Sequence, residues 1–249
     1  MSLRILLLTG IKEELVAVER RWHLQFNRHL HLYQSARYAG LYAGTTGPGL
    51  QRRREIRQWL NQLQPQIVVN AGLVGLLQAE HQAQVGDRVA LNQLIDSRYG
   101  TCFPGGPGRN RLASLTKAAF APHEKMDVAL DFKVDVCDME AAFLAGLLGQ
   151  FDKLSESISL VLVKVIGDRP EQYLLYQNEA LMRDWARLAW WRRIGRAMRF
   201  PGGPFLLHRL RTNKLRALQG LARHTDILLE HLIRHQGPGQ GIDSIFIPH

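Results

Sequence analysis

The sequence predicts an α/β fold with a single domain, in which a central mixed, largely parallel sheet is flanked by helices. Three continuous apolar segments, Ile5–Leu8, Ile67–Val69 and Ile158–Ile166, have the pattern of strands that are buried on both faces. Segments with helical periodicity lie between them, and strands that alternate with helices favour an α/β sheet. The chain of 249 residues is long enough to bury a sizeable core.

The remaining elements follow from hydrophobic periodicity and from Gly and Pro. Helices are expected over 12–21, 50–62, 122–130 and 138–148. Shorter strands are expected over 29–33, 40–45, 88–94, 112–115 and 134–136. Gly-rich turns are expected at 47–49 and 72–75, and a loop over 100–109, where the sequence is GTCFPGGPGR.

The chain is expected to divide into an α/β core and a helical extension. The core covers 1–178. The extension, 179–235, packs on the core as a hairpin of two helices, one ending near 199 and one running from about 205 to 234, with a break at PGGP. Residues 236–249 are expected to form a tail.

The composition excludes several classes of protein. With 46% apolar and 22% charged residues the chain is not disordered, and no apolar run is long enough to cross a membrane. Its two cysteines, Cys102 and Cys137, lie far apart, so no disulfide framework and no zinc site is expected, and a reducing cytoplasm is the default. The ten histidines lack metal-ligand spacing, and the dinucleotide fingerprint is missing, so neither a metal nor a cofactor is expected.

The net charge of +10 is concentrated near the C-terminus. Between Leu181 and His235 the chain has 12 Arg or Lys and 3 acidic residues. Aromatic residues are interleaved with these arginines over 185–205, a pattern typical of contact with the anionic inner face of a membrane. The alternative, favoured by the core-like spacing of Trp185 and Trp190, is that the aromatics pack inside and the arginines are solvated. No recognised nucleic-acid motif accompanies the charge.

Acidic residues follow three of the predicted strands. They are Glu14, Asp138, Glu140 and Asp168. Ligands of open α/β sheets bind beyond the carboxyl ends of the strands, so these side chains are candidates for one site. Cleavage of a glycosidic bond needs an acid for the leaving group, a carboxylate near the sugar and a base for water. Acidic residues at strand ends are common, however, and position alone favours Glu14 and Asp168 as helix caps or loop ion pairs.

Six short segments occur in the order seen in the nucleoside phosphorylase and nucleosidase superfamily. They are ILLLTGIKEELVAV, GTTGPGLQ, LQPQIVVNAGLVGLL, VGDRVAL, VCDMEAAFLAG and VLVKVIGDRP. From about Ile5 to Asp168 the chain thus resembles this superfamily, particularly the methylthioadenosine/S-adenosylhomocysteine nucleosidases. The resemblance implies cleavage of an adenine nucleoside, no cofactor and a homodimer.

The resemblance also implies a role for each matching residue. Asp168 matches the general acid that protonates N7 of the purine, and Glu14 matches the base that orients water. Glu140 matches the carboxylate that binds the ribose hydroxyls. The remaining expected substrate-binding residues are Met139, Asp138, Gly72, Gly75 and Lys164.

Some positions depart from the nucleosidase pattern and leave alternatives open. Leu73 and Gly167 replace serines, and Lys164 replaces an arginine. Hydrolysis is still favoured, because Glu13 and Glu14 would repel a phosphate dianion. The chain also resembles the hopanoid-associated phosphorylase branch, through its basic C-terminal region and the segment ASLTKAAFAPHEKMDVAL, which implies phosphorolysis of an adenosyl-lipid with phosphate as co-substrate. A third alternative is a nucleoside-binding protein without turnover.

Overall fold

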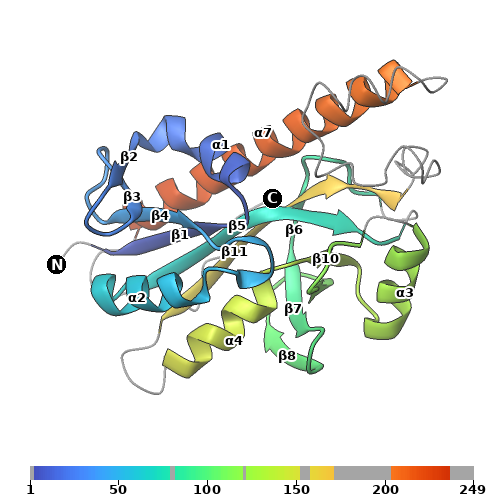
Figure 1. Ribbon diagram of the computed structural model, residues 1–249, viewed down its shortest axis with the longest axis horizontal. Helices are drawn as coiled ribbons and strands as arrows, with labels where there is room; N and C mark the ends of the chain where they lie inside the picture. Colours follow the sequence, from blue (N-terminus) through green and yellow to red (C-terminus); the bar gives the residue numbers. More distant parts are fainter. Residues whose placement is uncertain (1–2, 79–81, 120–121, 152–157, 171–202, 236–249) are drawn as a thin grey trace.

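The computed structural model describes residues 3–78, 82–119, 122–151, 158–170 and 203–235. Within these ranges a single mixed sheet of eleven strands carries helices on both faces (Figure 1). This arrangement confirms the predicted α/β fold. The first helix of the expected extension, the aromatic and basic segment up to residue 202 and the expected tail lie outside the described residues.

The sheet is parallel at its centre. β1 (Ile5–Thr9) lies between β4 (Leu41–Thr45) and β5 (Ile67–Leu76), and both pairings are parallel. β11 (Ser159–Asp168) also runs parallel to β5, whereas β10 (Val136–Asp138) is antiparallel to the end of β5. The outer strands are β2 (Leu24–Asn27), β3 (Leu32–Ser35), β6 (Arg88–Val89), β7 (Leu91–Asp96), β8 (Thr101–Pro104) and β9 (Asn110–Ser114). The carboxyl ends of β1, β5 and β11 therefore meet at one edge.

The helices explain why the first strand is apolar throughout. Ile5 and Leu7 pack against α1 (Lys12–Trp22) and α7 (Gly203–His235), whereas Leu6 and Leu8 pack against α2 (Arg53–Leu63) and α4 (Ala141–Phe151). Alternate side chains of a strand point to opposite faces, so a strand between two helical layers has no polar face. The short helices are η1 (Pro48–Leu50) and α3 (Pro122–Phe132).

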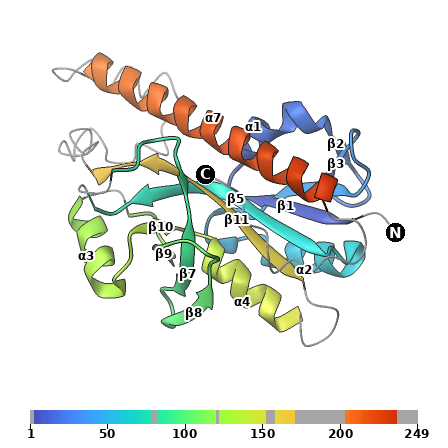
Figure 2. The same cartoon turned by 180° about the vertical axis from the view of Figure 1, so that it is seen from behind.

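The long helix α7 packs along α1 and β11 (Figure 2). Its buried residues recur at helical spacing: Ala217, Leu221, Leu228, Leu229 and Leu232. Asp226 accepts a hydrogen bond from the Trp22 indole at 2.8 Å, which ties α7 to α1. This helix confirms the second helix of the predicted extension, and among the described helices none is long and apolar enough to span a bilayer.

Three local predictions are wrong. Residues 72–75 are not a turn but the last part of β5, because their backbone pairs with β11. The expected strand over 29–33 is largely a turn, with His31 at a φ of 52°, between β2 and β3. The expected loop over 100–109 contains β8, which pairs with β7. In each case strand pairing, which local composition does not encode, decides the backbone conformation.

Candidate active site

A cavity of about 390 Å³ opens at the carboxyl ends of the central strands. Its lining combines Gly10 after β1, the last part of β5, the end of β10 with the residues that follow it, and the end of β11. Residues 115, 118 and 119, which follow β9, and Asn213 and Lys214 of α7 complete it. This volume lies in the range of small-molecule sites, and the cavity lies at the edge of the sheet where the sequence predicts a ligand site.

Glu14 is held rigidly at one side of this cavity. Glu14 lies in the first turn of α1. One of its carboxylate oxygens accepts hydrogen bonds from the backbone N–H groups of Gly10 at 2.8 Å and Ile11 at 3.0 Å. The other oxygen accepts from the N–H of Leu73 on β5, at 2.9 Å. Leu73, which replaces a serine of the nucleosidase pattern, thus still contributes to the site through its backbone N–H.

Glu140 faces Glu14 across Gly10. A Cβ atom on Gly10 would lie 3.1 Å from a Glu140 carboxylate oxygen and 3.2 Å from one of Glu14. Glycine at this position therefore lets the two carboxylates approach the same backbone segment. Both side chains line the cavity.

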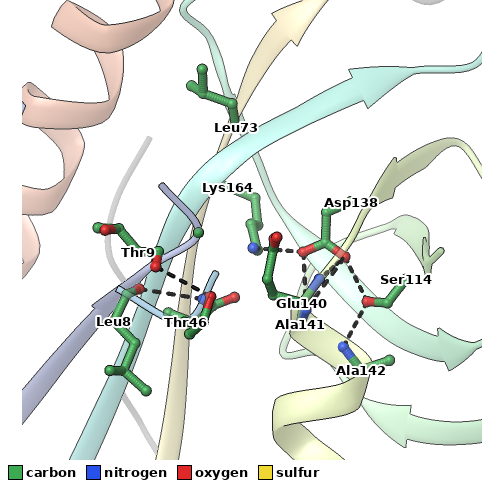
Figure 3. A network of polar contacts seen from close by, with 12 residues as sticks. Leu8, Thr9, Thr46, Leu73, Ser114, Asp138, Glu140, Ala141, Ala142 and Lys164 are labelled. Carbon is green, nitrogen blue, oxygen red and sulfur yellow. Dashed lines mark hydrogen bonds and ion pairs between the residues drawn. The ribbon is translucent and has the colours of Figure 1, made fainter. Parts of the chain in front are cut away.

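Asp138 organises the chain around Glu140 (Figure 3). Its oxygens accept hydrogen bonds from the N–H groups of Glu140 and Ala141, and so cap α4 at its N-terminus. Ser114 donates its hydroxyl proton to Asp138 at 2.5 Å and accepts the N–H of Ala142 at 2.8 Å. The Asp138 side chain is fully buried, so it acts on the site by orienting the start of α4.

Lys164 supplies a buried cation for this carboxylate cluster. Its ammonium forms an ion pair with Asp138 at 2.6 Å, and both side chains are fully buried. A Cβ atom on Gly72 would lie 3.4 Å from this ammonium, so Gly72 is the part of β5 beside the lysine. Neither Gly72 nor Lys164 lines the cavity; Lys164 acts on it through Asp138.

Burial and like charge perturb the carboxylates. Burial raises the pKa of Glu140 to about 8, with a further contribution from the charge of Asp138 and an opposing one from Lys164. Burial also raises the pKa of Glu14, against its backbone hydrogen bonds, which lower it. Burial lowers the pKa of Lys164, but the charges of Asp138 and Glu140 more than offset this and raise it above its ordinary value. Perturbed carboxylates in a cavity are typical of a catalytic site.

Asp168 lines the cavity at the carboxyl end of β11. A β-bulge between Ile166 and Asp168 ends the regular pairing of β11 with β5 and turns the strand at this point. Its carboxylate contacts the ammonium of Lys125, a buried residue of α3. Cys137 lies nearby, and burial raises the pKa of its thiol to about 12, so this thiol is neutral at physiological pH.

The structure thus brings together most of the residues that the sequence predicted. Asp168, Glu14, Glu140, Met139, Asp138 and Gly75 all line one cavity. Sequence reasoning missed the contributions of Asn213 and Lys214, and it assigned no role to Gly10 or Lys125, although both lie in segments that carry the resemblance. The described residues contain no cluster that could hold a metal ion.

Comparison with solved structures identifies the fold. Futalosine hydrolase of Helicobacter pylori matches 93% of this chain and 99% of its own, with a TM-score of 0.66 and 11% identity. The 5′-methylthioadenosine nucleosidase of Arabidopsis thaliana covers 95% of this chain and 98% of its own, with a TM-score of 0.62 and 12% identity. The chain has the fold of these enzymes.

A third match extends this result. The 5′-methylthioadenosine/S-adenosylhomocysteine nucleosidase of H. pylori covers 93% of this chain and all of its own, with a TM-score of 0.65 and 10% identity. No protein-family model and no curated protein matches the chain. At identities of 10–12% these matches establish the fold alone. The roles of individual side chains are therefore inferred from the geometry of the cavity.

Proposed function

We propose that this protein hydrolyses the N-glycosidic bond of a purine nucleoside. The observation that carries the proposal is the set of carboxyl groups that line one cavity: Glu14 and Glu140, both beside Gly10, and Asp168 at the end of β11. Such a set serves an oxocarbenium-like transition state, which needs negative charge near the sugar and a proton donor near the leaving base. The shared fold with nucleosidases supports the same reaction.

Each carboxylate takes one role in this reaction. As the glycosidic bond breaks, its electron pair passes to the purine, and N7 takes a proton from Asp168. Glu140 binds the ribose hydroxyls, with Met139 beside the ribose. Glu14 accepts a proton from the water whose oxygen bonds to C1′. Lys164 and Asp138 hold Glu140 in place. Gly72 lies beside Lys164, and Gly75 leaves room for Asp168.

Water is the favoured nucleophile over phosphate. The acidic residues Glu14, Asp138 and Glu140 lie around the buried ammonium of Lys164, which is already paired with Asp138. A phosphate dianion placed beside Glu14 would add charge of the same sign to a buried site, where repulsion is poorly screened.

The substrate we propose carries adenine. A variant of the H. pylori nucleosidase in which asparagine replaces aspartate holds 5′-methylthioadenosine in its active site. An adenine nucleoside of this kind would place its base toward Asp168 and its ribose toward Glu140. We also propose a homodimer in the cytoplasm, without a cofactor, as the working state of the enzyme.

The direct test measures release of free base from adenine, hypoxanthine and uracil nucleosides, with and without phosphate. We expect adenine release that does not depend on phosphate and that falls about 1,000-fold or more in Asp168→Asn and Glu14→Gln. Glu55→Gln, which changes an exposed carboxylate of α2, is the matched control. Release only with phosphate would contradict hydrolysis, and binding without any release would make the protein a nucleoside-binding protein.

A further inference from the structure

We propose that Lys125 is a positioning residue for Asp168, which fixes the oxygen from which the acid delivers its proton. The inference rests on the proposed function, because it assumes that Asp168 is the acid. Lys125 lies on α3, far from β11 in the sequence, and its ammonium is hydrogen-bonded to Oδ2 of Asp168.

The two partners differ in their burial. The Lys125 side chain is only 1% exposed, whereas that of Asp168 is 34% exposed and lines the cavity. The lysine thus approaches the carboxylate from within the protein and leaves its other side to a ligand. A buried ammonium needs an anionic partner, and this one contacts the carboxylate of the proposed acid.

The lysine determines which oxygen of Asp168 can carry the proton. An ammonium group has three donors and no acceptor, so Oδ2 must accept in this contact whether or not Asp168 is protonated. The acidic proton therefore belongs on Oδ1. This oxygen lies against Gly75, at 2.9 Å from the place where a Cβ atom would stand, and Gly75 lines the cavity. Lys125 thus directs the proton to the oxygen beside the ligand space.

The backbone alone would not fix this carboxylate. Asp168 follows the bulge at which the pairing of β11 with β5 loses its register, so the ladder constrains it less than the residues before it. Replacing a buried ion pair by apolar groups is often neutral for stability, so the fold does not by itself require a lysine here. Catalysis does require a fixed acid, because misplacement of a reacting group by about 1 Å costs about 100-fold in rate.

Lys125 is the cation that contacts Asp168 directly. The other titratable groups around this region are Cys137 and Asp138 of β10, Lys164 of β11 and Lys214 of α7. The Cys137 thiol is neutral, and Lys164 is paired with Asp138. Without Lys125, Oδ2 of Asp168 would lose its hydrogen-bond donor, and the carboxyl group could turn its proton away from the ligand space.

The test compares base release by wild type, Lys125→Met, Asp168→Asn and the double variant. We expect Lys125→Met to lower kcat about 100-fold with KM changed less than about 3-fold. In the Asp168→Asn background the same change should cost less than about 2-fold, because the lysine acts through the aspartate. Lys117→Met, an exposed lysine before α3, is the control.

A second variant keeps the test decisive if Lys125→Met does not fold. Lys125→Gln retains a hydrogen-bond donor for Oδ2, so kcat should fall less than about 10-fold and KM should stay within about 3-fold of wild type. A kcat loss of about 100-fold in Lys125→Gln, an unchanged kcat in Lys125→Met, or a full additional loss from Lys125→Met in the Asp168→Asn background would each overturn the inference alone. A wild type that releases no base from any nucleoside would overturn the proposed function, and this inference with it.

Discussion

Replacing Glu140 with Gln should make the protein more stable and less active. Burial raises the pKa of Glu140 to about 8, so the folded protein holds a proton that the unfolded chain releases above its ordinary value of 4.5. The free energy of unfolding of wild type therefore falls as pH rises between these two values, by about 1.4 kcal/mol for each pH unit. Across the whole interval the loss approaches about 5 kcal/mol. A glutamine does not ionise, so the Glu140→Gln variant does not lose this free energy of unfolding as pH rises.

Urea denaturation followed by tryptophan fluorescence measures this difference. We expect wild type and Glu140→Gln to have similar free energies of unfolding at pH 5, and the variant to be more stable by several kcal/mol at pH 8. At pH 8, where Glu140 of wild type is partly ionised, the same variant should lose most of its nucleosidase activity, since its neutral amide stabilises a cationic sugar poorly. Glu55→Gln, on the exposed face of α2, should show no such divergence. Parallel pH profiles for wild type and Glu140→Gln would refute the reasoning.

Two further predictions concern packing and reactivity. In Gly220→Ala the added methyl would lie 2.2 Å from the carbonyl oxygen of Gly86, so α7 must shift. The free energy of unfolding, measured by urea denaturation, should fall by about 3 kcal/mol. The control is Gly149→Ala in α4, where the added methyl has open space and should be neutral or stabilising by up to about 1 kcal/mol. Cys102 is exposed, whereas Cys137 is buried and burial raises the pKa of its thiol to about 12. Titration with a chromogenic disulfide should therefore show one fast-reacting thiol in the native protein and two in urea. Two fast-reacting thiols without urea would contradict this prediction.

The sequence was most informative where a segment is apolar along its whole length. The apolar runs Ile5–Leu8 and Ile158–Ile166 predict strands, and the structure contains β1 and β11 at these positions. It was misleading at residues 72–75, where glycines suggested a turn. There the ladder between β5 and β11 extends the strand, and Gly75 makes room for Asp168.

The candidate catalytic and ribose-binding carboxyl groups could also be found without a structure. Glu14, Glu140 and Asp168 each follow a strand that ends at the same edge of the sheet, and the order of the motifs resembles that of known nucleosidases. Lys125 could not be assigned a role in this way, because its segment shows only the pattern of an ordinary helix.

The sequence by itself determined the elements, the order in which they occur and the carboxylates that reach the ends of the strands. Only the tertiary structure decided which groups surround each carboxylate: Lys125 on Asp168, Lys164 on Asp138, and Gly10 between Glu14 and Glu140. The physical reason is that hydrogen bonding, burial and Coulomb interaction depend on distances through space. Those distances join residues that lie tens of positions apart, and local sequence patterns encode only neighbours along the chain.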